Sequence, residues 1–200
     1  MTTKLYERRN GAVVAREAEL AGAAEYDVIV AGLGTAGSIA AISAAERGMR
    51  VLGLERLNAM GGTGTIGAVV GYYFGNKGGL FEEIDRETQA LAKDPSYTKA
   101  GGINADLKEL ALERRAAASG VCFQYESTVI GVYREGPRVV GVRWVGPDGV
   151  QSARCRVLID CTGDAEAAAM AGASCLKGRD IDGKMQPFSN ALVWIKDDMV

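Results

Sequence analysis

The sequence predicts an α/β fold around a parallel sheet, and three observations lead to this prediction. An apolar strand that begins near Tyr26 runs into a glycine-rich turn, and an alanine-rich helical segment follows the turn. A second apolar strand then ends at the acidic Glu55. Later in the chain, β-branched stretches alternate with turn residues, as in antiparallel strands. We therefore expect a Rossmann-like βαβ sheet that binds a dinucleotide, with an inserted antiparallel β meander.

Three glycines of the first turn each occupy a position that a side chain would obstruct. Gly32 allows the tight turn, Gly34 lets the backbone approach a pyrophosphate, and Gly37 lets the helix pack close to the strand. The helix begins near Thr35 and continues through Ala36, so the free N–H groups of its first turn point at the bound anion. The turn is therefore a predicted diphosphate site.

The acid at the end of the second strand indicates which dinucleotide is bound. The carboxylate of Glu55 is placed to accept hydrogen bonds from both hydroxyls of an adenosine ribose. Its negative charge would repel a 2′-phosphate. FAD or NAD is therefore favoured over NADP.

Composition and charge limit the partners. The formal net charge is −2, with no basic stripe for nucleic acid or for a membrane surface. Residues 28–45 carry no charge, but they consist largely of Gly, Ala, Ser and Thr, which do not suit a membrane span. Residues 1–25 lack an apolar stretch of signal-peptide length. We expect a cytoplasmic protein with a small-molecule substrate, without nucleic acid or membrane partners.

The cysteines and the absence of histidine exclude several kinds of site. The four cysteines show no C-x-x-C spacing, and the sequence contains no histidine. We therefore expect no metal site and no cysteine–histidine nucleophile. Buried thiols in a reducing compartment are the expected role of the cysteines.

Further elements follow the βαβ unit. Eight glycines between residues 61 and 79 predict a loop or broken helix. Leu80, Ile84 and Leu91 predict one apolar face of a helix of about three turns, which Asp94-Pro95 closes. A second helix is predicted from an Asn104 cap to Gly120. Residues 121–129 read as a strand that would lie beside the first strand, and a β meander follows at about residues 128–160. The second helix is expected to bury Leu107, Leu110 and Ala111.

These elements divide the chain into three parts. Residues 1–25 are predicted to be an N-terminal extension, and residues 26–172 to be the dinucleotide-binding domain. Residues 173–200 would begin a substrate domain that the chain does not complete.

The strand after the meander leads into Thr162, Gly163 and Asp164, and an alanine-rich segment follows. Asp164 could cap that helix, which would contribute about 1 kcal/mol. Thr162 and Gly163 could also bring the backbone close to the cofactor at a second strand end. These two roles are compatible.

Several motifs occur in an order found in one group of flavoproteins. They are Gly32-Leu33-Gly34-Thr35-Ala36-Gly37, Glu55-Arg56, Gly61-Gly62-Thr63, the meander, and Cys161-Thr162-Gly163-Asp164. In this order the chain resembles the FAD-dependent oxidoreductase family, within the group that has two dinucleotide-binding domains. The resemblance covers roughly residues 25–200.

The resemblance implies a role for each motif. The first glycines and the helix would hold the FAD diphosphate, and the acid would bind the adenosine ribose. Gly61 and Gly62 would approach the diphosphate and ribityl chain, and the strand ending near Val129 would contact adenine through its backbone. The Thr-Gly-Asp turn would close over the cofactor. The activity implied is hydride transfer between a small organic substrate and the flavin.

The chain also departs from the family pattern. Cys161 replaces the commoner alanine, and the iron–sulfur cysteine clusters of some relatives are missing. The sequence ends at Val200, before the family's later glycine–aspartate segment, so we expect an N-terminal fragment that by itself binds FAD weakly or not at all. An NAD-dependent dehydrogenase and a non-catalytic nucleotide-binding remnant are the alternatives. No catalytic residue, substrate, electron acceptor or oligomeric state follows from the residues.

Overall fold

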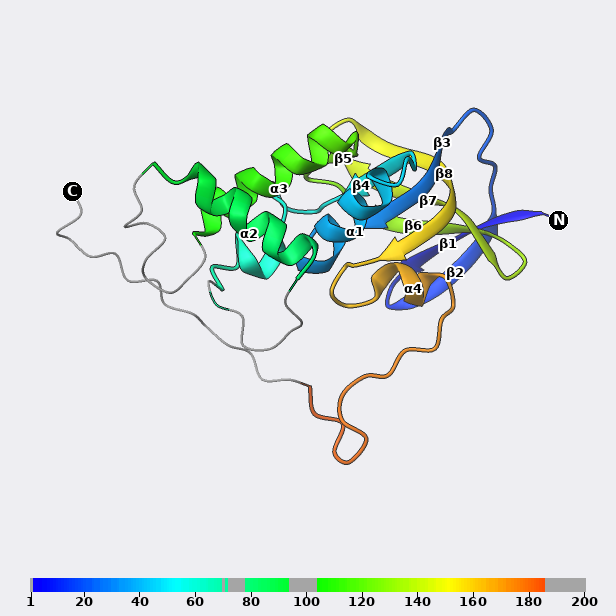
Figure 1. Ribbon diagram of the computed structural model, residues 1–200. Coiled ribbons are helices and arrows are strands. Elements are labelled where there is room, and N and C mark those ends of the chain that lie inside the picture. The colour runs from blue at the N-terminus through cyan, green and yellow to red at the C-terminus, as the bar shows by residue number, and fades with distance from the viewer. Residues whose placement is uncertain (1, 70, 72–77, 94–103, 186–200) are drawn as a thin grey trace.

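The computed structural model describes residues 2–69, 71, 78–93 and 104–185 (Figure 1). Its centre is an eight-stranded sheet in the order β2-β1-β6-β7-β8-β3-β4-β5. The strands are β1 (Thr3–Arg9), β2 (Ala12–Glu17), β3 (Ala24–Ala31), β4 (Val51–Leu54), β5 (Cys122–Gln124), β6 (Thr128–Glu135), β7 (Arg138–Gly146) and β8 (Gly149–Asp160). The helices are α1 (Thr35–Ala45), α2 (Leu80–Leu91), α3 (Ala105–Ser119) and α4 (Glu166–Met170), with a 3₁₀ helix η1 (Gly62–Gly64).

The parallel part of the sheet confirms the predicted α/β fold. β3 pairs in parallel with β4 on one side and with β8 on the other, and β5 adds to the far side of β4. α1 connects β3 to β4, so these three elements form the predicted βαβ unit. The carboxyl ends of β3, β4 and β8 therefore meet at one edge of the sheet.

The predicted meander is also present, and it shares a strand with the parallel sheet. β6, β7 and β8 pair antiparallel in sequence order. The first half of β8, through Arg154, pairs with β7, and residues 153–160 pair in parallel with β3. One continuous strand thus fixes the meander to the dinucleotide-binding unit.

Apolar side chains fill both faces of the parallel strands. One core lies between the sheet and the helices, where Val30 and Val51 meet Ile42 of α1 and Leu112 of α3. A second core lies on the other face and joins Ile29, Leu52 and Leu54 to Val142, Trp144, Ala153 and Cys155. The meander therefore covers the face opposite the helices.

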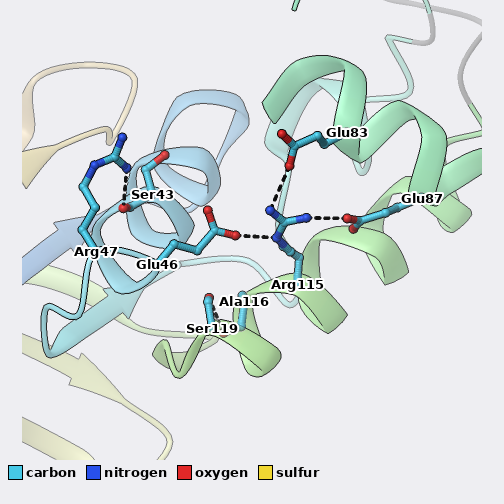
Figure 2. Close-up of polar contacts among 8 residues, drawn as sticks. All are labelled: Ser43, Glu46, Arg47, Glu83, Glu87, Arg115, Ala116 and Ser119. Atoms are coloured by element: carbon cyan, nitrogen blue, oxygen red, sulfur yellow. Dashed lines mark hydrogen bonds and ion pairs between the residues drawn. The ribbon is translucent and has the colours of Figure 1, made fainter. Parts of the chain in front are cut away.

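One arginine joins the three longer helices (Figure 2). The guanidinium of Arg115 on α3 donates to Glu46 at the end of α1 (2.5 Å), and to Glu83 (2.9 Å) and Glu87 (2.5 Å) on α2. These carboxylates raise the pKa of Arg115 above its usual value, with the hydrogen bond that Glu46 accepts from Arg115 as the largest cause. The cluster fixes α2 and α3 against the C-terminal end of α1. The glycine-rich turn lies at the N-terminal end of the same helix.

α3 has the predicted ends, but its buried face differs from the prediction at Leu110. The side chain of Asn104 accepts a hydrogen bond from the N–H of Leu107 (3.0 Å), and Gly120 has a left-handed φ of 85°. Leu110 was expected in the core, but it is 37% exposed, and this prediction was wrong. The buried positions of α3 are Lys108, Ala111, Leu112 and Ala116, so Ala111 is buried as predicted. They follow the i, i+3, i+4, i+8 spacing of one helix face.

The prediction of a strand over residues 121–129 beside the first strand was wrong. β5 ends at Gln124 and pairs with β4, because β8 already occupies the free side of β3. The chain then turns, with Glu126 at a φ of 52°, and β6 begins at Thr128. The N–H of Ser127 donates to the carbonyl of Glu55 (2.8 Å), which holds this turn beside the end of β4.

The N-terminal residues form a hairpin that was not predicted. β1 and β2 pair around Asn10 and Gly11, both with positive φ, and β1 pairs with β6. Asn-Gly is a strong hairpin signal, and it is present in the sequence between Arg9 and Ala12. The proposed boundaries at residues 25 and 172 stay predictions, and residues 186–200 of the third part lie outside the described residues.

No helix in the described ranges is long and apolar enough to cross a bilayer.

Candidate dinucleotide-binding site

The turn after β3 is constrained by close backbone contacts. Gly32 has a φ of 84°, and a Cβ there would lie 2.4 Å from the carbonyl oxygen of Cys161. A Cβ on Gly37 would lie 1.8 Å from the carbonyl oxygen of Gly32. Both positions therefore require glycine, and the close packing of α1 on the turn that was expected from Gly37 is present.

The N-terminus of α1 is the one best suited to an anion. Gly34 is its N-cap, no side chain caps the first turn, and the first turn contains no acidic residue. The other three described α-helices each carry an acid in their first turn. Thr35 and Ala36 are exposed, and a helix has no internal acceptor for its first N–H groups. These groups and the helix dipole therefore favour a negatively charged ligand.

The double glycine lies directly against this turn. A Cβ on Gly62 would lie 2.9 Å from the Cα of Gly34 and 3.2 Å from the backbone nitrogen of Thr35. The N–H of Gly61 donates to the carbonyl of Leu33 (2.9 Å). Two segments separated by nearly thirty residues thus expose bare backbone side by side.

Two threonines join these segments from the solvent side. The hydroxyl of Thr35 donates to the carbonyl of Gly61 (3.0 Å) and lies 3.0 Å from the hydroxyl of Thr63. Both threonines are exposed, so each hydroxyl has lone pairs or a proton left for a ligand. The structure therefore brings Thr35, Gly61, Gly62 and Thr63 together.

Glu55 is buried at the end of β4, with 6% of its surface exposed. One carboxylate oxygen accepts from the N–H of Leu33 (2.7 Å), and the other accepts from the N–H of Leu57 (2.9 Å). A carboxylate has about four acceptor positions, so two remain for further donors. Glu55 thus supports the first turn and also suits a ligand with paired hydroxyls. The neighbouring Arg56 is exposed.

The end of β8 completes the edge. The carboxylate of Asp160 accepts from the N–H (3.0 Å) and hydroxyl (2.8 Å) of Thr162 and from the N–H of Ala168 (2.7 Å). Asp160 was not among the predicted site residues, because in the sequence it is only an acid near the end of an apolar strand. Burial and then the charge of Asp160 raise the pKa of the Cys161 thiol, so this cysteine stays protonated and is a poor nucleophile.

The predicted helix cap at Asp164 was wrong. Asp164 is exposed, and Ala165 is the N-cap of α4, with no side-chain hydrogen bond. The first turn is held instead by the hydroxyl of Thr162, which accepts from the N–H of Glu166 (3.0 Å), and by Asp160. Thr162 and Asp160 thus take the N–H groups of Glu166 and Ala168 that a cap at Asp164 would compete for.

The remaining predicted positions lie on the same side of the sheet or next to it. Thr162 lies behind Gly32, since a Cβ on Gly32 would be 3.1 Å from the Cα of Thr162. Gly163 is exposed with a φ of 90°. Val129 is the second residue of β6, opposite Trp144, and is half-buried. It follows the turn that Ser127 fixes to Glu55, and does not end the strand that was predicted.

The turn, the double glycine and the acid together have the geometry of a dinucleotide site. A sequence model of the FAD dependent oxidoreductase family matches residues 27–199. The chain belongs to the FAD-dependent oxidoreductase family. The predicted family and its cofactor, FAD, are confirmed by this match, and the alternative of an NAD-dependent dehydrogenase is not favoured.

Curated relatives of this FAD-dependent oxidoreductase include enzymes named as lipid reductases. Digeranylgeranylglycerophospholipid reductase 1 of Methanopyrus kandleri is 32% identical over 155 residues, which are 70% of this chain and 40% of the relative. Digeranylgeranylglycerophospholipid reductase of Methanocella arvoryzae is 28% identical over 180 residues, which are 79% of this chain and 45% of the relative. The chain thus spans less than half the length of these relatives.

Solved structures share the fold. A geranylgeranyl bacteriochlorophyll reductase-like protein of Thermoplasma acidophilum superposes with a TM-score of 0.52 at 24% identity, covering 76% of this chain and 43% of that protein. THI4 of Thermovibrio ammonificans superposes with a TM-score of 0.52 at 22% identity, covering 73% of this chain and 61% of that protein. These likenesses support the Rossmann-like architecture of the FAD-dependent oxidoreductase described above.

Proposed function

We propose that the diphosphate of FAD binds where the turn after β3 meets the double glycine. The observation that carries this proposal is the contact of Gly62 with Gly34, where a Cβ would be only 2.9 Å from the neighbouring Cα. This cradle of bare backbone fits a ligand that needs a close approach. The N–H groups of Thr35, Ala36 and Gly37 would face the anion, and the Thr63 hydroxyl would contact the diphosphate and ribityl chain.

The adenosine end of FAD would lie at Glu55. Its two remaining acceptor positions match the two ribose hydroxyls, and its charge would exclude the 2′-phosphate of NADP. We place Arg56 beside the ribose. The backbone of Val129 would contact adenine, which is supported by the hydrogen bond from Ser127 to Glu55 two residues earlier.

The opposite side of the cofactor would be covered by Thr162, Gly163 and Asp164. Asp160 holds the Thr162 backbone in place, and the exposed Gly163 and Asp164 follow at the same edge of the sheet as Gly32. The carboxylate of Asp164 is free of a capping role in α4, so it is available to a ligand hydroxyl.

In the complete protein the activity would be hydride transfer between a small organic substrate and the flavin. FAD supplies the redox chemistry when it is bound, and the residues of this chain bind and orient it. All four cysteines are free, which supports a location in the reducing cytoplasm. We propose no nucleic-acid or membrane partner.

Cofactor analysis of the complete protein tests this function. The purified protein is heated, and the released compound is identified by its absorbance spectrum and mass. We expect FAD in about one equivalent per chain. Release of NAD, or no binding when the protein is incubated with excess FAD and filtered, would refute the proposal.

A further inference from the structure

Gln124 is the last residue of β5 and lies beside the carboxyl end of β4. The two strands pair in parallel, with Gln124 next to Leu54. The N–H of Glu55 donates to the carbonyl of Gln124 (2.9 Å). Gln124 is half-buried, so part of its surface faces solvent. A neutral polar side chain therefore lies next to the acid that is proposed to bind the ribose.

A buried tryptophan fixes which way the Gln124 amide faces. The indole Nε1–H of Trp144 donates to Oε1 of Gln124 (2.8 Å). An indole nitrogen only donates, so the amide presents its oxygen to Trp144 and its NH2 group points away from the indole. Trp144 is 4% exposed and belongs to the same buried cluster as Leu52 and Leu54. Its indole is therefore a fixed support for the amide.

The NH2 group of Gln124 is left as an unused donor. No residue in the ranges that the structure describes accepts a hydrogen bond from its Nε2. Within these ranges, the buried side-chain nitrogens and oxygens without a partner are the Nε atoms of Arg134 and Arg143. The Gln124 nitrogen is therefore open to solvent. A donor that is oriented from one side and open on the other can bind an acceptor on a ligand.

The surroundings of this donor match the proposed position of adenine. Val129, whose backbone is proposed to contact adenine, is the partner of Trp144 across β6 and β7. Trp144 is thus a neighbour of both Gln124 and Val129. Adenine presents ring nitrogens that accept hydrogen bonds, and glutamine amides pair with adenine in protein–DNA recognition. The free donor therefore has a suitable acceptor in the base of FAD.

We propose that the Gln124 amide donates a hydrogen bond to the adenine ring of FAD, and that Trp144 is a positioning residue that holds the amide in this orientation. Glu55 would then bind the ribose, and Gln124 would bind the base beside it. The inference rests on the proposed binding of the adenosine end of FAD at Glu55.

The first test removes the donor in the complete protein. Gln124→Glu keeps an oxygen for the Trp144 indole and replaces the NH2 group with an acceptor. Gln124→Met removes the donor without adding a charge. The FAD dissociation constant of each apoprotein is measured by titration, and we expect both variants to bind about tenfold more weakly. Gln89→Glu on the exposed surface of α2 adds the same charge and should keep the wild-type affinity.

The second test asks whether the lost affinity belongs to the base. ADP and ribose 5-diphosphate share the ribose and the diphosphate, and only ADP carries adenine. The Gln124 variants should lose about tenfold in affinity for ADP and keep their affinity for ribose 5-diphosphate. A change in the fold, or in the charge around the diphosphate, would weaken both ligands alike.

The third test examines the support from Trp144. Trp144→Phe keeps an aromatic ring and removes the indole N–H, so the amide can rotate away from the base. We expect about a threefold loss in FAD affinity. The double variant with Gln124→Met should bind no more weakly than Gln124→Met alone, because Trp144 acts through the amide.

Each outcome has a distinct meaning. Wild-type FAD affinity in both Gln124 variants would overturn the inference, and so would equal losses for ADP and ribose 5-diphosphate. A double variant that binds more weakly than Gln124→Met would show that Trp144 acts by another route. Failure of the wild-type protein to bind FAD would refute the proposed function itself.

Discussion

The backbone N–H of Leu33 donates a 2.7 Å hydrogen bond to the carboxylate of Glu55. This bond connects the turn after β3 to the end of β4. The acid that is expected to hold the ribose therefore also shapes the turn that is expected to hold the diphosphate. Both functions depend on the same side chain.

Glu55→Gln should weaken both the fold and the site. A glutamine offers one acceptor oxygen, so its amide would face either the Leu33 or the Leu57 N–H and leave that buried donor unpaired. We expect a loss of about 1–3 kcal/mol in the free energy of unfolding, together with weaker FAD binding. Denaturant unfolding and FAD titration measure the two effects. Glu17→Gln on exposed β2 is the control, and equal stability of the two variants would contradict this role of Glu55.

Gly62→Ala should reduce FAD affinity by about tenfold or more. The new Cβ would lie 2.9 Å from the Cα of Gly34, and the residue has a φ of 57° that alanine adopts only with strain of about 1 kcal/mol. Gly149→Ala is a matched control, because it also has a positive φ but no atom within 4 Å of its Cβ. The control should lose stability and keep FAD affinity. Equal FAD titration curves for the two variants would rule out the cradle.

Arg115→Met should loosen α2 and α3 from α1. Three carboxylates surround the guanidinium, and without it they repel one another (Figure 2). All four side chains are partly exposed, so we expect a loss of only about 1–2 kcal/mol in the free energy of unfolding. The loss should shrink at high salt, where the repulsion is screened. A salt-independent loss in thermal unfolding would show that packing alone is affected.

The thiol of Cys155 should make stability depend on alkaline pH. Burial raises its pKa to about 11, from a usual value of 9.0. The unfolded chain releases this proton first, so the contribution to stability is fully present below pH 9 and is lost as the pH rises from about 9 to 11. Unfolding of the wild type and Cys155→Ala at a series of pH values, with reductant, checks this. The variant should show a smaller fall over that range, and parallel curves would contradict the assignment.

The local sequence predicted much of the site. Gly32, Gly34 and Gly37 have positions that their spacing specified, because a glycine turn between a strand and a helix is determined by residues close in the chain. The same holds for Glu55 at the end of its strand and for the cap at Asn104. Asp160 was missed because its partners, Thr162 and Ala168, define its role only after the turn has formed. Asp164 was misread for the same reason.

Periodicity and turn chemistry act over a few residues, so the sequence by itself determined the βαβ unit, the meander and the family's cofactor. The tertiary structure alone decided which strands are neighbours. β8 fills the side of β3 that was expected for residues 121–129. The Asn10 hairpin pairs with β6 and extends the sheet beyond the meander. The tertiary structure also decided that the Trp144 indole donates to the Gln124 amide. Such contacts join distant parts of the chain, and they form only where burial of apolar surface across the whole sheet offsets the lost chain entropy.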